Sequence, residues 1–102
     1  MASDPHRISL ENAIPMVQRA RAGKLLPVHG WMFEAAIVRE ILAQDGCAGL
    51  RIYLAAKAGG DPTVVLVGTD AEGRDMTGGV IAEEALPCPP FCDDSSALNG
   101  RP

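Results

Sequence analysis

The spacing of apolar residues changes from helical to extended near the middle of the sequence, and this change constrains the fold more than any other feature. Between residues 33 and 42 the large apolar side chains recur every three or four positions, which predicts a helix with one apolar face. Between residues 50 and 54 they alternate with polar ones, which predicts a strand. Gly46 and Gly49 separate the two patterns. The chain must therefore combine helix and sheet in one core.

Three further segments complete the expected elements. Residues 63–67 are continuously apolar or β-branched, so they predict a central strand that is covered on both faces for part of its length. Residues 76–82 predict a third strand that Gly78-Gly79 weakens. Leu10, Ile14 and Val17 predict an earlier helix. Its expected N-cap is Asn12, because this choice leaves Pro15 in the first turn, where a missing N–H costs little.

These elements predict the α+β class, with two N-terminal helices packed on a short antiparallel β-meander of two to three strands and a C-terminal Pro/Cys loop. We expect a flexible segment at residues 1–8, one domain at 9–92 and a C-terminal tail at 93–102. From residue 83 onward no periodicity is visible, which predicts loop structure. The expected core residues lie on the second helix and the first two strands: Ile37, Ile41, Ile52, Leu54, Val65 and Val67.

Charge and composition exclude several classes of function. The formal net charge of the 102 residues is −4, and no basic stripe is present to neutralise phosphates, so we expect no nucleic-acid binding. Arg19, Arg21 and Lys24 are explained by the C-terminal end of the first helix, where cations are favourable. The sequence contains no run of 18 or more apolar residues, so we expect no insertion into a membrane. Three cysteines form no even disulfide framework, and we expect a cytoplasmic protein with reduced thiols.

Three segments, in this order, resemble a group of small uncharacterised bacterial proteins. They are Asp45-Gly46-Cys47 with Gly49 and Arg51-Ile52-Tyr53, then Val65-Leu66-Val67-Gly68 with Asp70, and finally Pro87-Cys88-Pro89-Pro90 with Cys92. The resemblance runs from the second helix to the C-terminal end of the sequence. It implies no activity and assigns no functional residues.

Cys88 and Cys92 flank Pro89-Pro90 and are the main candidates for chemistry. If the two prolines are extended, the Cα atoms of the cysteines are about 12 Å apart and cannot form a disulfide. If Pro90 begins a turn, the distance falls to about 6 Å, within bonding range. Two unpaired thiols are the simpler interpretation for a cytosolic protein.

A zinc site is a further possibility, because structural zinc takes four nitrogen or sulfur ligands. Cys47 is the natural third ligand beside Cys88 and Cys92, although it lies at the opposite end of the expected sheet. His29 is a poor candidate for the fourth ligand, because the second helix separates it from Cys47 by about 21 Å. We expect no cofactor, with zinc as the alternative, and interpret Cys47 as a small buried hydrophobic residue.

The sequence contains no grouping that indicates catalysis, so an enzyme is disfavoured, although the question stays open. Only His6 and His29 are available for general acid–base chemistry at neutral pH. The leading hypothesis is a non-enzymatic interaction or self-assembly module that binds itself or another protein through a strand edge, since short sheets leave such edges open. The alternative is a thiol-redox or metal-binding accessory protein using Cys88 and Cys92.

Overall fold

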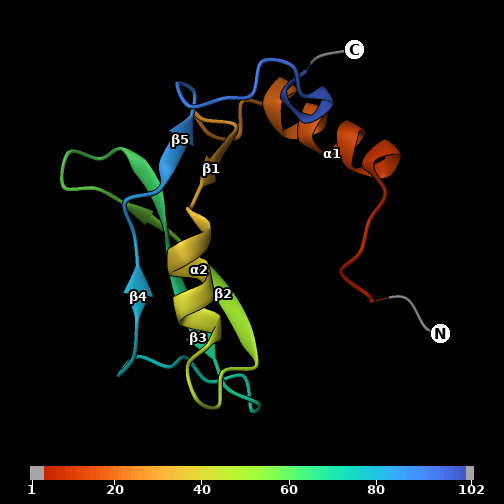
Figure 1. Ribbon diagram of the computed structural model, residues 1–102. Coiled ribbons are helices and arrows are strands. Elements are labelled where there is room, and N and C mark those ends of the chain that lie inside the picture. The colour runs from red at the N-terminus through yellow and green to blue at the C-terminus, as the bar shows by residue number, and fades with distance from the viewer. Residues whose placement is uncertain (1–3, 101–102) are drawn as a thin grey trace.

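A computed structural model describes residues 4–100 and confirms the α+β class (Figure 1). The structure contains two α-helices, a three-stranded antiparallel sheet, a separate two-stranded ribbon and a short 3-10 helix. In chain order the elements are α1 (Leu10–Ala22), β1 (Gly30–Met32), α2 (Ala35–Leu42), β2 (Gly49–Ala56), β3 (Pro62–Thr69), β4 (Ile81–Ala82), β5 (Leu86–Cys88) and η1 (Ala97–Asn99).

The strand β3 lies between β2 and β4, as the continuous apolar run predicts. Val64, Leu66 and Val67 on this strand are all buried, so both of its faces are covered. On one face Ile41 from α2 packs on Leu66 and on Ala82 from β4. These three side chains form the buried centre of the core, and Phe33, Ile37, Val38 and Val80 surround them.

The expected core is wrong in β2 and in part of β3. Val65 is only half-buried, and the register places Val65 and Val67 beside Tyr53 and Arg51, on the face away from Ile41.

Ile52 and Leu54 on β2 are 61% and 76% exposed, although the β2–β3 register places them opposite Leu66 and Val64, on the face that α2 covers. The reason is the length and position of the helix. Eight helical residues span only about 12 Å, and α2 covers the middle of the sheet without extending over all of β2, which is the edge strand.

The helix α1 differs from α2 in both its cap and its contacts. Its N-cap is Ser9, whose hydroxyl accepts a hydrogen bond from the N–H of Asn12. The prediction of Asn12 as the cap is therefore wrong, and Pro15 lies inside the helix. α1 contains no buried residue and packs against η1, apart from the sheet that α2 covers (Figure 1).

The two-stranded ribbon was not expected. β1 and β5 pair antiparallel, with Trp31 opposite Pro87. The prediction of loop structure after residue 83 is therefore wrong for β5 and for η1, which bring the C-terminal region back to α1 (Figure 1).

The two segments expected on either side of the domain, 1–8 and 93–102, lie partly outside the described residues. Residues 1–3 of the expected flexible segment and residues 101–102 of the expected tail are not described. Between them, the N–H of Arg7 donates to the carbonyl oxygen of Asp4 at 3.0 Å and forms a turn. None of the helices within residues 4–100 has the length and apolar character needed to cross a bilayer.

Candidate functional site

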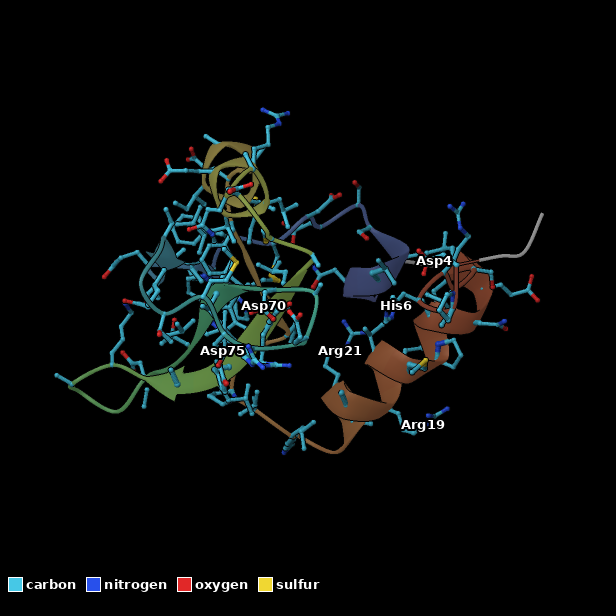
Figure 2. The ribbon with its side chains drawn as sticks, turned by 90° about the horizontal axis from the view of Figure 1, so that it is seen from below. Asp4, His6, Arg19, Arg21, Asp70 and Asp75 are labelled. Atoms are coloured by element: carbon cyan, nitrogen blue, oxygen red, sulfur yellow. A yellow bond between two sulfur atoms is a disulfide. The ribbon has the colours of Figure 1, made fainter. Side chains whose placement is uncertain are left out.

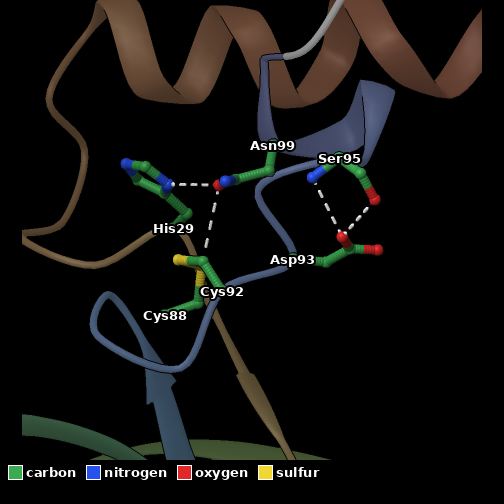
Figure 3. The surroundings of a disulfide bond; sticks show 6 residues. All are labelled: His29, Cys88, Cys92, Asp93, Ser95 and Asn99. Atoms are coloured by element: carbon green, nitrogen blue, oxygen red, sulfur yellow. Dashed lines mark hydrogen bonds between the residues drawn. A yellow bond between two sulfur atoms is a disulfide. The ribbon is translucent and has the colours of Figure 1, made fainter.

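The loop after β5 closes on itself and forms a disulfide between Cys88 and Cys92 (Figure 3). The N–H of Phe91 donates to the oxygen of Pro87 at 2.9 Å, and the N–H of Cys92 donates to the oxygen of Pro90 at 3.0 Å. These bonds turn the chain, so the two Cα atoms lie 4.7 Å apart. Of the two conformations considered for this loop, the one with the cysteines within bonding distance is therefore found. The interpretation of Cys88 and Cys92 as two unpaired thiols is wrong.

His29 lies directly beside the disulfide because it precedes the first residue of the ribbon. Its backbone N–H donates to the oxygen of Cys88 at 2.6 Å, which extends the β1–β5 pairing by one bond. Its ring Nδ1 lies 3.0 Å from Oδ1 of Asn99, at the end of η1 (Figure 3). The same Oδ1 lies 3.7 Å from Sγ of Cys88. Asn99 thus connects the imidazole with the sulfur pair.

These contacts gather three side chains that bind transition metals. A ring nitrogen of His29 and the Sγ atoms of Cys88 and Cys92 all lie within 4.8 Å of one another. The imidazole is exposed and both cysteines are half-buried. They line an open pocket of about 250 Å³, into which Trp31 also extends.

A carboxylate lies at the rim of the same pocket. Asp93 accepts hydrogen bonds from the hydroxyl of Ser95 at 2.6 Å and from its backbone N–H at 3.0 Å (Figure 3). The hydrogen bond from the Ser95 hydroxyl, and to a smaller extent that from the Ser95 N–H, hold the pKa of Asp93 below its ordinary range. Asp93 therefore keeps its negative charge beside the pocket to a lower pH than an ordinary aspartate does.

The structure does not bring Cys47 into this group. Cys47 is half-buried in the turn after α2, and its thiol donates to the oxygen of Gly49 at 3.3 Å. This turn and the loop after β5 lie at opposite ends of the molecule (Figure 1). The place of His29 beside Cys88 and Cys92 is not predicted from the sequence, because the length of the second helix relates His29 only to Cys47. Recognition of β1 in the apolar residues after Gly30 would have revealed it.

The edge of β2 is a second candidate site. Leu50, Ile52 and Leu54 are 36%, 61% and 76% exposed on one face of this strand. On the other face Arg51 bonds Asp75 at 2.6 Å, and the hydroxyl of Tyr53 also donates to Asp75. The charge of Arg51 is thereby compensated within the molecule.

The loop that supplies Asp75 belongs to the sheet. Figure 2 shows Asp70 and Asp75 together on this loop, away from Arg19 and Arg21 on α1. Asp70 accepts hydrogen bonds from the backbone N–H groups of Glu72 and Arg74, which is a typical turn arrangement. The charged groups of this loop are thus accounted for within the molecule, whereas the exposed apolar side chains Leu50, Ile52 and Leu54 on β2 are not.

The chain matches no protein-family profile, and it resembles no curated protein and no solved structure significantly. The resemblance to small bacterial proteins stays a prediction. A proposal of function must therefore come from the two sites themselves.

Proposed function

We propose that this protein is a non-enzymatic self-assembly module in which two copies pair through the edges of their β2 strands. One observation carries the proposal: an eight-residue edge strand exposes three large apolar side chains, Leu50, Ile52 and Leu54. Native proteins protect long edge strands with charged side chains, proline, a bulge or a covering segment. β2 contains no proline, its one charged residue, Arg51, is paired with Asp75, and the strand pairs continuously with β3 through all eight residues.

The local sequence favours a second copy over an unrelated partner. Leu50-Arg51-Ile52-Tyr53-Leu54 reads almost symmetrically about Ile52. In an antiparallel pair centred on Ile52, that residue faces its own copy, and each Leu50 faces a Leu54. Arg51 then faces Tyr53 of the other copy, so like charges do not meet. The product would be one continuous six-stranded sheet, built from the two three-stranded sheets.

The apolar surface contributes to such pairing. A leucine or isoleucine side chain gains about 1.5–3 kcal/mol when it passes from full exposure to full burial. These side chains are already partly buried in one copy, so covering all the surface that Leu50, Ile52 and Leu54 still expose in both copies contributes an upper limit of roughly 5–10 kcal/mol by the same measure. Association costs roughly 4–15 kcal/mol in lost freedom of motion. We therefore expect a dimer whose population depends on protein concentration.

Cross-linking tests both the pairing and its register. In a Cys47→Ser background, which removes the free thiol, Ile52→Cys places two new thiols opposite each other across the two-fold axis. Directly opposed residues have Cα atoms about 4.5–5.5 Å apart, within the range for a disulfide. We expect mild oxidation to produce a covalent dimer of this variant.

Leu54→Cys in the same background is the matched control. Its two copies lie about 14 Å apart along the strands in the proposed register, too far to form a disulfide. Equal cross-linking at the two positions would contradict the register. A monomer at every accessible concentration, measured by light scattering, would reject self-assembly altogether.

A charge exchange tests the same axis without cysteines. Ile52→Lys and Ile52→Glu should each be monomeric, because like charges meet at the centre, whereas a mixture of the two should associate. Failure of the mixture to associate, with both variants folded by circular dichroism, would argue against pairing at Ile52.

The thiol-redox or metal-binding function is the second candidate, and the proximity of His29 to Cys88 and Cys92 favours it. In the cytoplasm, which we expect as the location, disulfides are mostly transient, so the dithiol form would be populated there. We expect no enzymatic turnover in either case.

A further inference from the structure

We propose that reduction of the Cys88–Cys92 disulfide creates a binding site for one Zn²⁺ ion, with His29 as the third ligand. This site is independent of pairing through β2, because its residues belong to the β1–β5 ribbon and the loop that follows it. The oxidised form has no free thiolate to offer, so the site exists only in the reduced protein.

The donor set fits zinc. Two thiolates and one imidazole are zinc ligands, whereas magnesium and calcium prefer oxygen. Zinc sites with three protein ligands leave the fourth position to water or to an external molecule. Here the ligands line a pocket that opens to solvent, so a fourth ligand can enter.

The distances require only a local adjustment. With Zn–S bonds of about 2.3 Å, the two sulfurs of a tetrahedral site lie about 3.8 Å apart. Breaking the sulfur–sulfur bond allows this separation by side-chain rotation. The imidazole nitrogen already lies within 4.8 Å of both sulfurs, and the backbone bond from His29 to Cys88 holds the two segments together.

Asn99 prepares the imidazole for coordination. Because an amide oxygen only accepts hydrogen bonds, Oδ1 of Asn99 favours the neutral tautomer with its proton on Nδ1 and a lone pair on Nε2. A hydrogen bond to one ring nitrogen is the usual support for a histidine that binds metal through the other. Turning the ring so that Nε2 faces the sulfurs moves Nδ1 away from the present position of Oδ1, so the side chain of Asn99 must follow the ring for this support to be kept.

The redox step is balanced with a small-molecule reductant or oxidant. A phosphine and one water reduce the disulfide: the phosphine becomes its oxide, and the sulfurs gain two electrons and two protons as thiols. Zn²⁺ displaces both thiol protons and forms two Zn–S bonds and one Zn–N bond. A small-molecule disulfide reverses the reduction and the zinc binding. It takes two electrons from the two thiolates, which form the Cys88–Cys92 bond again and release the zinc. The small-molecule disulfide is itself reduced to two thiols, with two protons from water.

Cobalt titration of the reduced protein tests the site directly. The protein is reduced with a phosphine, freed of reductant without oxygen, and titrated with Co²⁺, which reports thiolate ligands through a charge-transfer band. We expect one ion per chain, displacement by Zn²⁺ but not by Mg²⁺, and a change in the fluorescence of Trp31, the single tryptophan, which lines the pocket. The oxidised protein should show none of these signals.

Matched variants identify the ligands. Cys88→Ser, Cys92→Ser and His29→Ala should each lower the Co²⁺ affinity by at least about 10–100-fold, the loss typical even of groups that only support a ligand. Cys47→Ser should leave the affinity unchanged, since this thiol lies elsewhere. His29→Ala keeps the backbone bond to Cys88, and circular dichroism checks that each variant is folded. Absence of the charge-transfer band in reduced wild-type protein, or an equal loss with Cys47→Ser, would overturn the proposal.

Discussion

Replacing Ile41 by alanine should destabilise the protein more than any surface substitution, because Ile41 is 0% exposed at the centre of the core. The change removes three carbon atoms, and at about 0.8 kcal/mol for each the lost transfer energy is about 2.4 kcal/mol. A cavity adds to this cost, but the partly buried neighbours Ile37 and Val38 can move inward. We therefore expect a loss of about 2–3.5 kcal/mol in the free energy of unfolding.

Urea unfolding followed by circular dichroism measures this loss at a fixed protein concentration, so that any dimer contributes equally. The control is Leu25→Ala, because Leu25 is 75% exposed and lies outside β2. The control should change the free energy by less than about 0.5 kcal/mol. If Ile41→Ala costs no more than Leu25→Ala does, α2 does not pack on the sheet as described, and the account of the core is refuted.

Three further predictions concern the thiols, the response to acid, and the hydrogen bond between the turn after α2 and the segment before β4. Labelling of unreduced, unfolded protein should modify Cys47 alone, and labelling after reduction should modify all three cysteines; modification of all three before reduction would contradict the disulfide. The hydrogen bond from Lys57 is the main cause that lowers the pKa of Glu83 from its ordinary value of 4.5 to about 2. The Glu83 carboxylate therefore stabilises the folded protein fully above pH 4.5, and this stabilisation is lost as the pH falls toward 2. Acid unfolding of Glu83→Gln should show a weaker pH dependence over that interval, and an unchanged dependence would remove this carboxylate as the cause. Gln44 accepts a hydrogen bond from the N–H of Val80 at 2.7 Å, so Gln44→Met should cost about 1–3 kcal/mol in urea unfolding, and a neutral result would show that water replaces the bond.

The sequence predicts those elements that have a clear hydrophobic period. The apolar face of α2, the alternation in β2 and the continuous run in β3 are all found. The faces of Ile52 and Leu54 are right, but Val65 and Val67 lie on the opposite face of the sheet from Ile41. What alternation does not reveal is whether another element covers that face. Ile52 has the pattern of a core residue and is nevertheless exposed, because coverage depends on the length and position of α2.

Short pairings between distant segments cannot be predicted from the sequence, for a different reason. β1 and β5 contain three residues each, too few for a period to be recognised, and β5 includes a proline. Once this ribbon is missed, nothing in the sequence places His29 beside Cys88. The cysteine spacing alone left both the open and the closed loop possible, and backbone hydrogen bonds around Pro87 and Pro90 decide between them.

The packing of α1 against η1 determines the order in which the chain can fold during synthesis. α1 leaves the ribosome before every strand, whereas its contact partner is made only after the whole sheet. α2, β2 and β3 are neighbours in sequence, so they can assemble while synthesis continues. α1 has no buried residue of its own and a short helix is marginal in water, so it must wait for η1. Among the described elements, α1 is therefore made before η1 but packs only after η1 has been synthesised.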